Sequence, residues 1–274
     1  MSQRLFEDAN QAFHYSRARP SPPANLITQS INYLNEKILP NSNSKWQLAI
    51  DVGAGTGQCT RLLQPYFEKI IGFDVSEAQV NEANKGNSFL NVHYAISEAE
   101  SLPLPDDSVD LLTACQCLHW FDMQAFFKEA QRVLKTDGVL AVIGHDVPKL
   151  YSTDKQELPL TNLLYDTFHG DILKPYIQSD RLELLHNGYK DIEFPFAQVS
   201  RENVHTDLKT TAEDCIELIK SWSNFQSCVQ NDHSTAMALI NDLQQAFISH
   251  FNQESLSKIE MIARRNYALI LCRK

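Results

Sequence analysis

The chain has 274 residues, of which 43 % are hydrophobic and 21 % are charged, a balance typical of globular proteins and not of disordered ones. Its 24 Lys and Arg residues against 34 Asp and Glu residues give a formal net charge of −10. That deficit of basic residues argues against a surface that grips nucleic acid or an anionic membrane. Neither a spanning run of about 18 apolar residues nor a signal peptide is apparent. We therefore expect a reduced, cytoplasmic protein.

The first half of the chain alternates short apolar runs with helical patterns. In chain order the apolar runs predict strands at residues 47–52, 69–74, 89–94, 109–115 and 139–144. Helices are predicted between them at 56–66, from Ser76 onward, where Gln79 completes the pattern of a capping box, and after Asp122. The last of these helices is expected to stop at residues 137–138. Apolar strands that alternate with helices indicate a parallel sheet covered on both faces.

The alternation of apolar runs with helical patterns does not continue in the second half of the chain. It is predicted to contain an irregular helical stretch at 148–187, a strand at 189–199, helices at 211–223 and 235–251, and a last strand at 267–272. We expect a single domain over 1–274, with an N-terminal cap segment at 1–45, a cofactor-binding core at 46–146, and the remaining strands with helices of a substrate lid at 147–274. A proline-rich hinge at 19–23 precedes the core.

Glycine usage points to a ligand. The chain has only nine glycines, and three of them, Gly53, Gly55 and Gly57, fall in one turn between a predicted strand and a predicted helix. Such a turn lets a ligand lie against bare backbone N–H groups. Asp74 ends the next strand, 17 positions after Gly57. A carboxylate there can accept both hydroxyl protons of a ribose, so the pattern predicts a nucleoside-containing cofactor.

The motif does not fit a dinucleotide. In the pattern G-x-G-x-x-G the third glycine position is occupied by Gln58 in one frame and by Thr60 in the other. The order that does occur, D-x-G-x-G-x-G from Asp51, is the one found in S-adenosylmethionine-dependent methyltransferases.

Several further segments resemble class I S-adenosylmethionine-dependent methyltransferases, and more narrowly the trans-aconitate methyltransferase-like group of small-molecule enzymes. They are the leading Tyr15…Arg19-Pro20…Pro23 segment, the strand end Gly72-Phe73-Asp74, the loop at 97–103, the strand and turn at 110–121 with His119-Trp120, and Ser221-Trp222-Ser223. The resemblance is good over about residues 10–146. It implies a Rossmann-like α/β fold with a seven-stranded mixed sheet, mostly parallel with an antiparallel last strand, flanked by helices and carrying helical lid insertions.

The resemblance also implies S-adenosyl-L-methionine as cofactor and a set of residues that bind it: Tyr15, Arg19, Asp51, Gly53, Ala54, Gly55, Asp74, Val75, Glu98, Ala99 and Gln116. Glu98 stands where Asp is usual. For the acidic residues the alternatives are helix capping at Asp74 and a solvated loop at Glu98.

His119 is the candidate catalytic residue, as a general base or as a hydrogen-bonding partner of the substrate; a structural histidine is the alternative. Trp120, His145 and Trp222 are candidate substrate residues, with the protein core as the alternative for the tryptophans. Cys115, Cys117 and His119 would alternate on one side of a strand, but no fourth ligand has suitable spacing, so no metal is predicted.

The function predicted is methyl transfer to a small molecule, with O-methylation of a carboxylate as a candidate reaction, by a monomer or weak homodimer that binds neither nucleic acid nor membrane. The alternatives are a methyltransferase for a protein or another macromolecule, a nicotinamide-dependent oxidoreductase, and a non-catalytic partner subunit. The negative electrostatic potential of an acidic protein would repel an anionic acceptor, so arginines near the pocket mouth would be needed to make the local potential positive. The candidates are Arg17, Arg19, Arg264 and Arg265.

Overall fold

A computed structural model describes residues 21–41, 43–177 and 179–274. Its centre is one sheet whose strands follow the order β3-β2-β1-β4-β5-β8-β6, with β7 also paired to β8. The strands are β1 (Trp46–Val52), β2 (Phe67–Asp74), β3 (Val92–Ile96), β4 (Val109–Cys115), β5 (Leu134–His145), β6 (Lys149–Tyr151), β7 (Gln198–Thr211) and β8 (Glu260–Arg273).

The strands β1 to β5 pair in parallel, whereas β8 runs antiparallel to each of its partners. β7 pairs along all of β8, so β5 and β6 share the opposite side of that long strand, β5 beside 267–273 and β6 beside 262–264. This confirms the predicted Rossmann-like α/β class with an antiparallel last strand. The sheet has eight strands in the described part of the chain, and not the seven predicted.

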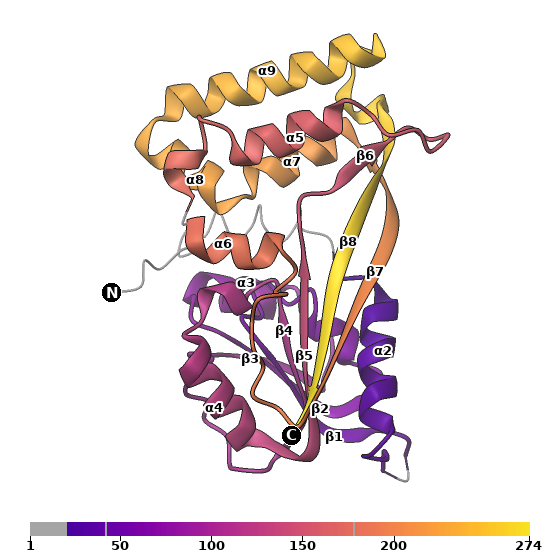
Figure 1. Cartoon of the computed structure of the whole chain (residues 1–274), viewed down its shortest axis with the longest axis vertical. Helices are drawn as coiled ribbons and strands as arrows, with labels where there is room; N and C mark the ends of the chain where they lie inside the picture. The colour runs from indigo at the N-terminus through magenta and orange to yellow at the C-terminus, as the bar shows by residue number, and fades with distance from the viewer. Residues whose placement is uncertain (1–20, 42, 178) are drawn as a thin grey trace.

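Helices cover both faces of the parallel strands (Figure 1). One face packs against α2 (Ala24–Asn35), the short η1 (Thr60–Leu63) and α3 (Glu77–Lys85). The other face packs against α4 (Met123–Val133) and the segment at 189–196. Because α2 contributes buried Leu26, Ile27 and Leu34 to this core, that part of the predicted N-terminal cap segment belongs to the sheet layer.

A separate helical layer lies at one end of the sheet (Figure 1). We call it the lid: α5 (Leu160–His169), α6 (Ser179–His186), α7 (Ala212–Lys220), α8 (Ser223–Asn231) and α9 (His233–Phe251). Two short turns accompany it, η3 (Lys174–Tyr176) and η4 (Leu256–Lys258). Helices α5, α7, α8 and α9 share one apolar core with β6 and the first residues of β8. The long β7 and β8 therefore connect the lid directly to the sheet.

Three helices begin at capping residues where helix starts were predicted. Ser76 accepts a hydrogen bond from the Gln79 backbone N–H at 3.3 Å, Asp122 caps α4, and Thr211 forms a full capping box with Asp214. The predicted helix at 56–66 is wrong, since only the 3₁₀ turn η1 forms there. The predicted strand at 189–199 is also wrong, because β7 begins only at Gln198.

The end of α4 was also predicted too late. This helix ends at Val133, and β5 starts directly at Leu134, before the expected stop at residues 137–138. Asp137 instead has a left-handed φ of 63° inside the strand region. Among the described residues, no helix is both long and apolar enough to cross a lipid bilayer.

Candidate functional site

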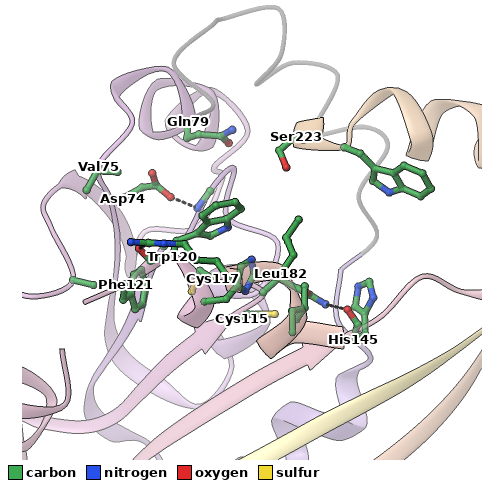
Figure 2. A pocket seen from close by; sticks show the side chains of 18 of the residues that line it. Asp74, Val75, Gln79, Cys115, Cys117, Trp120, Phe121, His145, Leu182 and Ser223 are labelled. Atoms are coloured by element: carbon green, nitrogen blue, oxygen red, sulfur yellow. Dashed lines mark hydrogen bonds between the residues drawn. The ribbon is translucent and has the colours of Figure 1, made fainter. Parts of the chain in front are cut away.

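A cavity of about 1100 Å³ lies between the lid and the carboxyl ends of β1, β2, β4 and β5. In this fold the chain moves outward from β1 to β2 and β3 on one side and through β4 to β5 on the other, so the cavity is at the switch point of the sheet. Figure 2 shows Asp74, Val75 and Gln79 on one side of it and Ser223 of α8 on the other. We call this cavity the main pocket.

Most of the predicted site residues line the main pocket. Those that do are Gly53, Gly55, Asp74, Val75, Glu98, Ala99, Gln116, His119, Trp120, His145 and Trp222. Asp51 and Ala54 instead line a small cavity of about 50 Å³ that shares Gly53, Gly55, Gln116 and His145 with the main pocket. Tyr15 and Arg19 lie outside the described residues, as does Arg17.

The glycine turn has the backbone that only glycine adopts without strain. Gly53 and Gly57 have φ values of +60° and +87°. A Cβ on Gly53 would lie 2.7 Å from the Cys117 Cβ, and a Cβ on Gly57 would lie 2.1 Å from the Tyr94 hydroxyl. Gly53 therefore lets the turn pass the end of β4, whereas Gly57 makes room for a tyrosine of β3.

Asp74 holds the glycine turn in place. Its Oδ2 accepts the Gly55 backbone N–H at 2.8 Å, and its Oδ1 accepts the Ser76 backbone N–H at 2.9 Å. The helix cap of α3 is Ser76 and not Asp74, so the capping alternative is wrong. An ionised carboxylate offers about four acceptor sites, which is more than these two bonds use. Asp74 can thus fix the turn and still accept hydrogen bonds from a ligand.

Asp51 is buried below the turn. Its side chain is 1 % exposed and accepts hydrogen bonds from the Thr60 and Thr113 hydroxyls, each at 2.6 Å. Burial raises the pKa of Asp51 to about 6, against the lowering effect of those two hydroxyls. Because Asp51 and Thr113 are neighbours across β1 and β4, the carboxylate joins two strands and η1 just beneath the small cavity.

This raised pKa predicts a pH-dependent effect of Asp51→Asn on stability. The folded state prefers the protonated acid, so the contribution of Asp51 is complete below pH 3.8 and is lost as the pH rises through about 6. We expect Asp51→Asn to raise the free energy of unfolding at pH 8 by about 1–3 kcal/mol and to leave it nearly unchanged at pH 4. Urea unfolding without ligand at both pH values measures this. An equal change in the free energy of unfolding at the two pH values would contradict the prediction. The control is Asp171→Asn, at an exposed aspartate, which should show no such pH dependence.

The loop after β3 borders the main pocket on the side of Asp74. Glu98 is exposed, whereas Ala99 is 4 % exposed. Glu100 accepts the Asp122 backbone N–H at 2.8 Å and so ties this loop to the start of α4. Val75 remains 44 % exposed although it is apolar, which leaves its surface available to a flat ligand group.

The end of β4 turns sharply toward the pocket. Gln116 has a φ of +60°, an uncommon value for a residue with a side chain, and its amide donates to the His145 carbonyl at 3.3 Å. β4 ends at Cys115, and the Cys117 thiol donates to the Val52 carbonyl at 3.1 Å. The predicted alternation of Cys115, Cys117 and His119 along one strand is therefore wrong.

His119 is buried in the turn η2 (Leu118–Trp120) and pairs with Tyr189. Its Nδ1 lies 3.0 Å from the Tyr189 hydroxyl. Burial raises the pKa of Tyr189 well above its ordinary value, and a hydrogen bond from the His119 backbone N–H opposes this rise. The direction of the hydrogen bond depends on the tautomer of His119: Nδ1 accepts the Tyr189 hydroxyl proton when the ring proton is on Nε2, and donates to the hydroxyl when it is on Nδ1.

Tyr189 was missed by sequence reasoning. It is fully buried, has a left-handed φ of 58°, and its ring occupies the space that a Cβ on Gly144 would need, at 2.6 Å. A glycine inside an otherwise apolar strand was the available signal, because it marks the close approach of another group.

Aromatic side chains and one arginine form the part of the main pocket nearer the lid. Trp222 is 4 % exposed and packs edge-on against Phe168 with ring centroids 4.8 Å apart. Arg181 of α6 lines the pocket and donates from Nη1 to the Trp120 carbonyl at 2.5 Å. Nothing in its local sequence distinguishes this arginine from a solvated helix residue.

Two arginines predicted near the pocket mouth lie elsewhere. Arg264 makes a two-point ion pair with Asp207 between β7 and β8, at 2.6 and 2.7 Å. Arg265 is 5 % exposed in β8. Neither residue lines the main pocket, so that expectation is wrong for both.

The comparisons with known proteins agree with this geometry. The model of a methyltransferase domain family matches residues 50–142. A Dictyostelium discoideum protein described as a methyltransferase is 32 % identical over 200 residues, 73 % of either chain. A Saccharomyces cerevisiae protein, CRG1, described as an S-adenosylmethionine-dependent methyltransferase, is 24 % identical over 269 residues, 86 % of this chain and 87 % of that one.

Solved structures show the same fold. A type II methyltransferase from Anaeromyxobacter dehalogenans superposes with a TM-score of 0.69 at 23 % identity, over 93 % of this chain and 97 % of that one. A methyltransferase from Anabaena variabilis has a TM-score of 0.55 at 22 % identity, over 90 % and 97 % of the two chains. Fold and site thus define a class I methyltransferase. The chain belongs to the S-adenosylmethionine-dependent methyltransferase family.

Proposed function

We propose that this protein binds S-adenosylmethionine against the glycine turn and transfers its methyl group to a small molecule held under the lid. The observation that carries the proposal is the main pocket, which runs from the turn to the lid helices with a volume of about 1100 Å³. Pockets for one drug-sized ligand are roughly 300–1,000 Å³. The pocket thus has room for a cofactor and a small acceptor together.

The residues around the turn suit the parts of S-adenosylmethionine in order. Asp74 would accept the ribose hydroxyls, and the adenine would lie between Val75 and Ala99 with Glu98 toward its amino group. The methionine end would extend past Gly53 and Gly55 toward Gln116. Asp51 would act from below, through the turn and the small cavity that it lines. Tyr15 and Arg19 would close the site from the segment that precedes the described residues.

The chemistry then needs alignment more than activation. When bound, the donor would supply a methyl group that its positive sulfur already makes reactive; the acceptor would form a bond to that carbon as the carbon–sulfur bond breaks and S-adenosylhomocysteine is released. Holding the three atoms in line and excluding water contribute several kcal/mol to such a step. The aromatic wall of Trp120, Phe168 and Trp222 supports the exclusion of water from the acceptor end.

His119 would bind the acceptor as a hydrogen-bond donor. If Nδ1 accepts the Tyr189 hydroxyl proton, Nε2 would carry the ring proton, which suits an acceptor oxygen. A carboxylate acceptor is ionised at neutral pH and needs no base. We therefore propose the substrate-binding role for His119 rather than the general-base role.

An anionic acceptor would take its countercharge from Arg181, which lines the described part of the pocket near Trp120. A carboxylic acid, O-methylated as in the trans-aconitate-like group, is therefore the acceptor class that we propose.

Two features disfavour the alternative functions. The lid over the pocket favours a small molecule over a protein substrate, and the missing third glycine disfavours a nicotinamide cofactor. We also propose that the protein acts in the cytoplasm as a monomer or weak homodimer.

The test is a transfer assay with isotope-labelled S-adenosylmethionine and a metabolite extract, read by mass spectrometry. We expect labelled esters that base hydrolysis reverses, and a rate at least tenfold lower for Arg181→Ala and for His119→Asn. Lys174→Ala, on the lid surface outside the pocket, is the control and should retain the full rate. Label found only in protein, or donor binding without transfer to any extract component, would overturn the small-molecule assignment.

A further inference from the structure

Three metal-ligating side chains converge where the lid meets the sheet. Asp146 follows the end of β5, His169 ends α5 and His186 ends α6. One ligand atom from each lies within 4.8 Å of the other two. Among the described residues of this chain, this is the group of three or more His, Cys, Asp and Glu side chains that meets such a distance limit. None of the sequence motifs pointed to it.

The hydrogen bonding of this cluster is incomplete. His186 Nδ1 lies 2.5 Å from Asp146 Oδ1, which also accepts the Val147 backbone N–H at 2.6 Å. The Nε2 atoms of His169 and His186 are both buried and have no hydrogen-bond partner among the described residues. Two buried imidazole nitrogens without partners in neighbouring rings are unusual, because buried polar groups are nearly always paired.

We propose that Asp146, His169 and His186 bind a divalent transition-metal ion, with Zn²⁺ as the expected occupant. Imidazole nitrogen and carboxylate oxygen form the ligand set that Zn²⁺ takes in sites with an open position. Ligands at about 2.0–2.1 Å from a tetrahedral ion are roughly 3.3 Å apart. The ligand atoms now lie within 4.8 Å of one another, so the side chains would draw closer around a bound ion.

An ion bound at this cluster would affect both the stability of the lid and the binding of the acceptor. It would fasten α5 and α6 to the end of β5, so the lid would be more stable with metal than without it. Asp146 and His186 also line the main pocket, so an open coordination position would face the acceptor. An oxygen of an anionic acceptor would then meet a positive charge in an otherwise acidic chain. This second consequence rests on the proposed function, whereas metal binding itself does not.

The experiment uses the full-length protein, stripped with a chelator and titrated with Co²⁺ alone and with Zn²⁺ alone. We expect one ion per chain, a visible ligand-field absorption band for Co²⁺ that Zn²⁺ removes, and a Tm that rises with Zn²⁺. His169→Gln and His186→Gln should each weaken Zn²⁺ binding at least tenfold. His250→Gln, an exposed histidine of α9, is the matched control and should bind Zn²⁺ as the unaltered protein does.

Two outcomes would overturn the proposal: no stoichiometric binding, or binding that both cluster variants leave unchanged. Circular dichroism and the Tm of the metal-free variants separate a lost site from a lost fold. Asp146→Asn provides a further check, since it preserves the shape and removes the charge. Binding of S-adenosylmethionine to the metal-free protein is measured separately, so failure of the metal site and failure of the proposed function are distinguishable.

Discussion

Replacing Asp74 with alanine is expected to weaken S-adenosylmethionine binding at least 100-fold while the protein remains folded. The substitution removes the carboxylate proposed to accept two ribose hydroxyls, and hydrogen bonds to a charged group contribute about 1.5–3 kcal/mol each. It also releases the Gly55 backbone N–H, now held at 2.8 Å, so the turn that faces the cofactor becomes less ordered. Isothermal titration calorimetry with the donor measures the affinity.

Asp171→Ala is the matched control for this prediction, because Asp171 is an exposed aspartate outside the main pocket. Its affinity for the donor should equal that of the unaltered protein. An unchanged affinity of Asp74→Ala would refute the proposed placement of the ribose. A loss accompanied by a Tm far below that of the control would instead assign Asp74 a structural role in the turn.

Replacing Gly53 with alanine is expected to lower the free energy of unfolding by about 2–4 kcal/mol and to abolish donor binding. A side chain at a φ of +60° is strained, and the new Cβ would lie 2.7 Å from the Cys117 Cβ and 2.9 Å from its sulfur. Relief of this contact must move either the turn or the end of β4. Both border the main pocket, so stability and affinity should fall together.

Gly86→Ala separates this local effect from the general cost of losing a glycine. Gly86 follows α3 with a φ of −84°, and its added Cβ would meet its nearest atom at 3.7 Å, an ordinary contact. We expect a change in unfolding free energy within about 1 kcal/mol and unaltered donor affinity. If Gly53→Ala behaved like Gly86→Ala in urea unfolding and calorimetry, the tight approach of the turn to Cys117 would be unimportant.

The core elements were predictable because their signals are local. Buried parallel strands carry continuous apolar runs, and caps such as Ser76 and Asp122 depend on residues three positions away. The strand predicted at 189–199 is wrong over residues 189–196 because the apolar side chains there pack against the sheet and α4 without joining the sheet. Phe194 and Phe127 of α4, for example, have ring centroids 5.2 Å apart. Strand β7 was missed because its alternating polar residues suit a strand at the edge of the sheet, where one face is solvated.

The glycine turn and the spacing to Asp74 determined the cofactor class. A nucleoside cofactor without phosphate needs exposed backbone at a turn and an acidic residue on the adjacent strand, and both features lie in one short stretch of sequence. Only the tertiary structure decided the rest of the site. It paired Tyr189 with His119, brought Arg181 into the pocket in place of Arg264, and joined Asp146 to two histidines of the lid. Those partners are 23 to 70 residues apart along the chain, from Asp146 with His169 to His119 with Tyr189, and they become neighbours only on folding. The acidic composition likewise excluded classes of partner, but the position of each countercharge depends on how the lid packs on the sheet.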